Sequence, residues 1–138
     1  MTDILKALIV FLKADSDVTA LAGERVYGNE IPPEEFEQRQ PHKLALIVQS
    51  GGIERNRFLP IAEPRFDVWS FGETYYEAGK LDRAIYDALK ALDRKTADNV
   101  LLHGIALSGG PFQVRDDRTN WPAKWRSITV SADERIIV

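Results

Sequence analysis

The sequence predicts an α+β fold in two layers, a mainly antiparallel sheet of four to five strands covered by two amphipathic helices. One observation is the helical spacing of apolar residues in two segments, at the start of the chain and past its middle. Another is that the other apolar segments are short and joined by short polar links, which favours antiparallel hairpins. Two such helices can cover one face of the sheet.

The length and composition fit one domain. The chain has 138 residues, of which 44% are hydrophobic and 28% charged, as in ordinary globular proteins. A domain of this size buries about two-thirds of the surface that its unfolded chain exposes, without a disulfide or a metal. We therefore expect residues 1–138 to form a single domain.

Charge and cysteine content narrow the function classes. The net charge of -3 gives no support to a free-standing nucleic-acid binder, which usually has a basic face. The absence of cysteine excludes thiol catalysis, disulfides and thiolate metal sites. The apolar stretch Ile4–Leu12 is too short to span a bilayer and lacks a cleavage site. We expect a protein made in the cytoplasm, with no membrane segment.

The predicted helices have recognisable ends. The first is expected over roughly Asp3–Ala14. The second long helix starts at a capping box, in which Thr74 accepts from the amide of Glu77 and Glu77 reaches back, and it runs to about Leu92. A short helix at Val18–Ala22 is expected between them. Its cap is Ser16 or Asp17 and its stop is Gly23. The apolar stripe of the second long helix is Leu81, Ile85, Ala88, Leu89 and Leu92.

Four segments are expected as strands. Glycine pairs at Gly51-Gly52 and Gly109-Gly110 are expected to end the first and the third. In the second, Phe66 and Val68 point one way, and Arg65, Asp67 and Trp69 point the other. The strands are Leu44–Gln49, Arg65–Phe71, Val100–Leu107 and Lys124–Ser131, with extended segments at Arg25–Tyr27 and Ile136–Val138.

The segments between these elements are expected to be loops. Pro33 could open one helical turn in the proline-interrupted stretch Gly28–Lys43. The other loops are Ile53–Pro64, Asp93–Asn99 and Gln113–Ala123.

Catalytic and metal-binding patterns are sparse. His42 and His103 do not form a metal-spaced pair, and the sequence has no phosphate loop, dinucleotide fingerprint or nucleophile elbow. The best acid pair is Asp116-Asp117, whose adjacent side chains would diverge rather than converge on a substrate. We predict no enzyme activity, no cofactor and no metal site. A small carboxylate–metal nuclease stays as an alternative.

Several segments, taken in order, resemble one family: the tail-terminator (tail-completion) proteins of long-tailed phages, prophages and gene-transfer agents. The resemblance covers nearly the whole chain. It rests on residues at turns and at the ends of helices and strands rather than on a catalytic signature. The segments are Asp15–Tyr27, Ile31-Pro32-Pro33, Pro41 before Leu44–Gln49 and Gly51, Phe66–Ser70 followed by Thr74–Ala78, and Asp117-Arg118-Thr119.

The resemblance implies a structural virion protein of the tail or neck, assembled in the bacterial host cytoplasm. Similar proteins form a ring, typically a hexamer, on the last ring of the tail tube, where they stop tube growth and join tail to head. The implied partners are other copies of the chain, the tail tube protein and head–tail connector proteins. DNA would pass through the ring without sequence-specific binding, which a slightly acidic protein suits.

A ring needs contacts between subunits, for which long loops with isolated large side chains are candidates. We expect these contacts, or contacts with the tube, in the loops Ile53–Pro64 and Gly109–Pro122. The candidate residues are Arg55, Arg57, Phe58 and Trp121. For Trp121, packing beneath its loop is an equal alternative.

Two other kinds of function remain open besides the nuclease. The chain could be another neck or head–tail connector subunit, or a minor tail protein, on a similar small fold. It could also be a host protein-interaction domain unconnected to phage.

Overall fold

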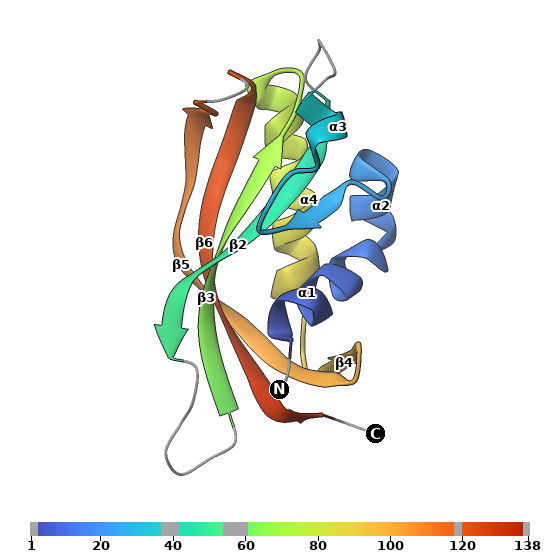
Figure 1. The fold of residues 1–138 in the computed structure, drawn as a ribbon, viewed down its shortest axis with the longest axis vertical. Helices are drawn as coiled ribbons and strands as arrows, with labels where there is room; N and C mark the ends of the chain where they lie inside the picture. Colours follow the sequence, from blue (N-terminus) through green and yellow to red (C-terminus); the bar gives the residue numbers. More distant parts are fainter. Residues whose placement is uncertain (1–2, 37–41, 54–60, 118–119, 137–138) are drawn as a thin grey trace.

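The computed structural model describes residues 3–36, 42–53, 61–117 and 120–136, and shows a curled sheet with helices packed on one face (Figure 1). The strand order is β1-β2-β3-β6-β5-β4. The strands are β1 Val26–Gly28, β2 Leu44–Ile53, β3 Ile61–Phe71, β4 Lys95–Ala97, β5 Val100–Arg115 and β6 Pro122–Ile136. The helices are α1 Ile4–Lys13, α2 Ser16–Ala22, α3 Pro33–Phe36 and α4 Tyr75–Lys90.

The predicted α+β class is confirmed, with two corrections to the sheet. The described residues form six strands rather than four to five, and β1 pairs parallel with β2. The four long strands β2, β3, β6 and β5 pair antiparallel, as predicted. The additional strand, β4, lies inside the expected loop Asp93–Asn99. A three-residue strand is too short to show a periodic apolar pattern, so β4 could not be predicted from periodicity.

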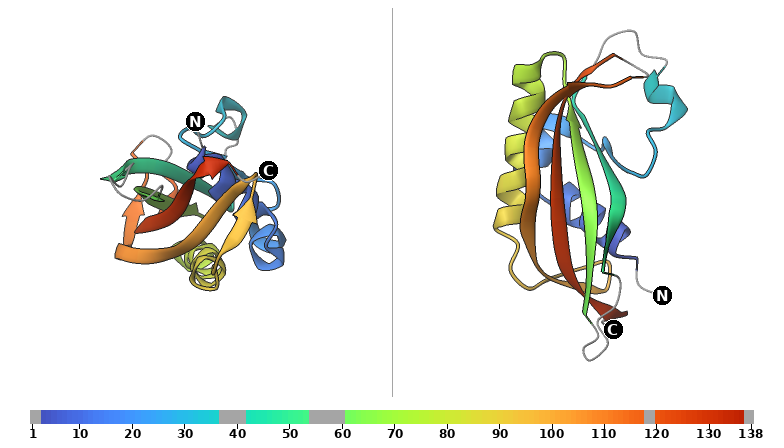
Figure 2. Two further views of the ribbon diagram at one scale, coloured as in Figure 1. Left: turned by 90° about the horizontal axis from the view of Figure 1, so that it is seen from below. Right: turned by 90° about the vertical axis from the view of Figure 1, so that its left-hand side faces the viewer.

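Helices α1, α2 and α4 cover one face of the sheet, with α3 on the other side (Figure 2). Between the covered face and the helices lies the main core. It contains the predicted stripe of α4 and residues that alternate along the strands. Fully buried members include Leu8, Leu12, Ile47, Phe66, Val68, Leu81, Ile85, Leu89, Leu102, Ile128 and Val130.

The helix caps agree in part with prediction. Thr74 Oγ1 accepts from the amide of Glu77 at 3.2 Å, and Asp3 caps α1. The cap of α2 is Asp15 rather than Ser16 or Asp17, because Asp15 has the extended backbone and its carboxylate accepts from two following amides. A hydrogen bond from Lys43, 3.1 Å away, lowers the pKa of Glu77.

Two strands were expected to end at glycines, and both continue through them. β2 runs through Gly51-Gly52, where a register shift absorbs the positive φ angles of 112° and 95°. A side chain at Gly52 would collide with the backbone of β3. β5 continues past Gly109-Gly110 to Arg115 with further register shifts. The expected loop Gly109–Pro122 is therefore mostly a hairpin, because glycine bulges leave pairing intact on both sides.

No helix among the described residues is long and apolar enough to cross a membrane.

Candidate functional site

The helix-free face of the sheet is the first candidate surface. Along β3, Phe66 and Val68 face the helices, while Arg65, Asp67 and Trp69 face away, as predicted. One end of this face carries a second, smaller apolar cluster next to the α3 segment. The buried members of this cluster are Ile31, Leu44, Leu46, Phe71, Trp121 and Ala123.

An aromatic row, made of Trp69, Trp125 and Phe112, crosses three strands of the helix-free face. The three residues are direct cross-strand partners on β3, β6 and β5. Their ring centroids are 6.0 Å apart for Trp69 and Trp125 and 4.9 Å apart for Trp125 and Phe112. Phe112 is 48% exposed, so the row ends in an uncovered apolar ring. Aromatic residues of this kind are enriched in protein–protein interfaces.

Trp121 lies at the covered end of the helix-free face and is only 6% exposed. Its ring packs edge-on against Phe71 and His42 at centroid distances of 6.3 Å and 5.0 Å. Trp121 therefore packs against neighbouring side chains, which is the alternative that the sequence left open beside a contact role. Its predicted role in contacts with other subunits is not tested by the structure of one chain.

A small polar network holds the α3 segment beside Trp121. The Tyr27 hydroxyl donates to Glu35 Oε1 at 2.7 Å, and the other oxygen of Glu35 contacts His42 Nε2. Burial, and then the hydrogen bond to Glu35, raise the pKa of Tyr27 to about 12. The network has a structural role, since Glu35 ties β1 to the segment leading into β2.

The other three predicted contact residues, Arg55, Arg57 and Phe58, lie outside the described residues. So does most of the predicted loop Ile53–Pro64. Their role stays a prediction.

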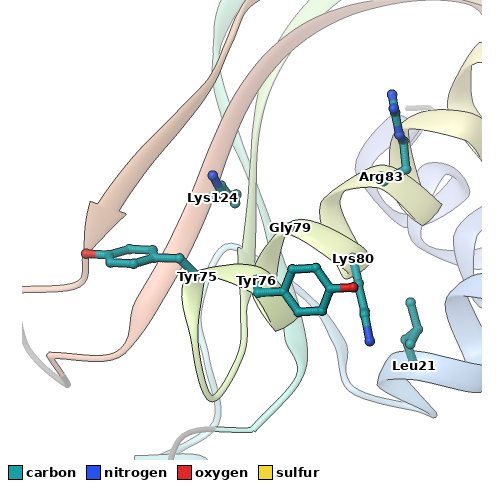
Figure 3. Close-up of a pocket in the computed structure, with 7 residues that line it drawn as sticks. All are labelled: Leu21, Tyr75, Tyr76, Gly79, Lys80, Arg83 and Lys124. Atoms are coloured by element: carbon teal, nitrogen blue, oxygen red, sulfur yellow. The ribbon is translucent and has the colours of Figure 1, made fainter.

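A shallow hollow at the start of α4 is the second candidate surface (Figure 3). Lys80 lies over the ring of Tyr76 at 4.7 Å, and Tyr76 is 72% exposed. Gly79 leaves room on the helix, where a Cβ would lie 3.6 Å from Lys124 Cε. The lining is cationic and aromatic and contains neither a carboxylate nor a histidine. It consists of Leu21, Tyr75, Tyr76, Gly79, Lys80, Arg83 and Lys124.

A buried ion pair fixes α4, and with it the hollow, to the sheet. Arg126 on β6 donates to both carboxylate oxygens of Asp82 at 3.0 Å and 2.7 Å, and both side chains are 6% exposed. The Arg126 guanidinium also lies 4.1 Å from the ring centroid of Tyr86. Sequence reasoning missed this pair, because Asp82 lies beside an apolar stripe and looks like a solvated helix residue.

The residues considered for chemistry lie in separate places. His42 contacts Glu35 near α3, whereas His103 is in β5. Asp116 and Asp117 are in the turn between β5 and β6. Across the described parts of the chain, no three His, Cys, Asp or Glu residues are grouped so that they could hold a metal ion.

Comparison with known proteins gives a match at the level of the fold, but not at the level of the sequence. No model of a known protein family matches the sequence, and no curated protein matches it. The fold is similar to that of a chain in a solved structure of the virion of a native gene transfer agent (GTA) particle, with a TM-score of 0.69. The likeness covers 92% of each chain at 17% sequence identity. The comparison therefore shows that this chain shares its α+β fold with a chain of that particle.

Proposed function

We propose that this chain is a structural virion protein that forms a ring of six copies at the head-proximal end of a phage-type tail tube. The ring stops tube growth, joins the tail to the head-side connectors and lets DNA pass. The observation that carries the proposal is the fold similarity to a GTA virion chain, which extends over 92% of both chains. The resemblance of the sequence to tail-terminator proteins favours the same role.

The surface of the chain has features suited to assembly with other copies and other virion proteins. A ring grows by a head-to-tail contact between two different patches of each subunit. Besides any contact between copies, the aromatic row on the helix-free face and the cationic hollow beside α4 on the opposite side are open to the tube or to the head-side connectors. The net charge of -3 suits a ring through which DNA slides without being gripped. Contacts with neighbouring copies or the tube are proposed for Arg55, Arg57, Phe58 and Trp121.

Electron microscopy of particles that lack this gene, from the phage or prophage that carries it, tests the proposal. Full heads without tails, beside tubes of unregulated length, are expected. Normal tailed particles would exclude the role. Tubes of normal length that fail to join heads would indicate a connector subunit instead. Assembly that survives substitution of all four contact residues would remove those residues from the proposal.

A further inference from the structure

The two outer long strands of the sheet are only partly paired. β1 pairs with β2 at Ala45–Ile47, and β4 pairs with β5 at Val100–Leu102. Among the described strands, no partner lies along the outer side of residues 48–53 of β2 or residues 104–115 of β5. Figure 2 (right) shows β5 and β2 on opposite sides of the β3–β6 pair. Each edge therefore presents unpaired backbone N–H and C=O groups.

The two open edges lie at the same height in the sheet. The register connects Gln49 of β2 through Phe66 and Ile128 to Leu107 of β5. Val48 connects in the same way, through Asp67 and Ser127, to Gly109. Residues 48–53 and residues 104–109 are thus at matching levels on opposite edges.

The strand directions also match. β2, β3, β6 and β5 alternate in direction, so β5 runs opposite to β2. A second copy placed beside β5 in the same orientation would present its β2 antiparallel to that strand. Edge-to-edge joining would therefore continue the antiparallel pattern from one copy into the next.

The residues at both edges leave the backbone accessible. Gln49, Ser50, Gly51 and Gly52 of β2 are exposed, as are Ala106, Leu107 and Ser108 of β5. Neither stretch contains a charged residue, in a chain of which 28% is charged. Protected edges usually carry charges, lysine above all, to prevent pairing. Leu107, 45% exposed, would be covered by such a contact.

We propose that copies of this chain join edge to edge, with residues 104–109 of one copy pairing antiparallel with residues 48–53 of the next. The contact is head-to-tail, since it uses two different edges, and it closes into a ring if each step rotates the next copy. The ring rests on the proposed function, whereas the pairing does not. The register shifts at Gln49/Gly52 and Leu107/Gly109 limit the paired run to a few residues.

Cysteine cross-linking tests the contact, because the chain has no cysteine of its own. The test variant combines Gln49→Cys and Leu107→Cys. Within one chain these positions are three strand spacings apart, roughly 14 Å, so they cannot form an internal disulfide. The expected result with mild oxidant or a short bismaleimide is a ladder of covalent oligomers on a denaturing gel. Each single variant is expected to give monomers only.

A matched control moves one cysteine off the open edge. Gln49→Cys combined with Thr96→Cys, an exposed residue on β4, should give no ladder. A further variant adds Ala106→Lys to Gln49→Cys/Leu107→Cys, which places a charge on the proposed edge. It should reduce the oligomers several-fold, while the midpoint of urea unfolding stays close to that of the variant without Ala106→Lys.

The cross-linking is run on concentrated protein and on assembled particles that carry the variant. A ladder in either, absent from the β4 control, supports the pairing. The absence of a ladder from both would overturn it, even if deletion of the gene gave the terminator phenotype. A ladder in protein whose gene deletion leaves tails normal would remove the proposed function and keep the pairing.

Discussion

The two faces of the sheet are built from the same strands but differ in chemistry. The covered face carries Phe66, Val68, Ile128 and Val130, all fully buried against the helices. The helix-free face carries the aromatic row and polar residues such as Arg65, Asp67 and Ser127, and its buried apolar cluster is confined to the end near α3. The difference indicates that the covered face supplies most of the stability, whereas the other face is available for contacts.

The largest loss of stability is expected from a substitution on the covered face. Phe66→Ala removes a fully buried ring and should lower the free energy of unfolding by about 3–5 kcal/mol. Urea unfolding followed by tryptophan fluorescence measures it. A loss below about 1 kcal/mol would contradict the assignment of this face as the main core.

Breaking the buried ion pair should be nearly as harmful. Asp82→Ala leaves the Arg126 guanidinium buried and unpaired, which should destabilise the protein by about 3–5 kcal/mol. The matched control is the double variant Asp82→Leu/Arg126→Met. It should recover most of the loss in urea unfolding, because no charge is then buried. A double variant as unstable as Asp82→Ala would show that packing, not the unpaired charge, is responsible.

Removal of an aromatic ring from the helix-free face should lower stability far less than removal of one from the covered face. Phe112→Ala removes a half-exposed ring stacked on Trp125 and should lower stability by about 0.5–1.5 kcal/mol. Urea unfolding of Phe112→Ala and Phe66→Ala under the same conditions compares the contributions of the two faces to stability. Equal losses for Phe112→Ala and Phe66→Ala would remove the distinction between them.

The smallest expected effect is the pH dependence of stability that arises from Tyr27. The Tyr27 pKa of about 12 lies above the value of about 10 for an unfolded chain. The unfolded state therefore loses this proton first. The stabilisation is complete below pH 10 and is lost as pH rises toward 12. Urea unfolding from pH 8 to 12 should show a steeper loss for wild type than for Tyr27→Phe. Parallel curves would contradict the raised pKa.

The covered face was predictable from sequence because burial imposes a repeating pattern. Spacing alone located the stripe of α4 from Leu81 to Leu92, and alternation gave both directions of β3. The Thr74 cap followed from a local pattern. In each case the signal lies within one element, so no tertiary information is needed.

What the sequence did not reveal depends on contacts between distant segments. The glycine pairs looked like strand ends, because a bulge is recognisable only when pairing resumes beyond it. Trp121 reads equally well as an exposed or a packed residue until His42 and Phe71 are placed beside it. The open edges of β2 and β5 require the strand order, which periodicity cannot supply.

Cryo-electron microscopy of intact particles from the phage or prophage that carries this gene tests the central claim most directly. We expect density for this fold as a six-membered ring at the head–tail junction, with β5 of each copy beside β2 of the next. A ring in that place with other strands or loops between subunits would contradict only the edge pairing. This chain found elsewhere in the particle, or absent from it, would contradict the assignment as a tail terminator.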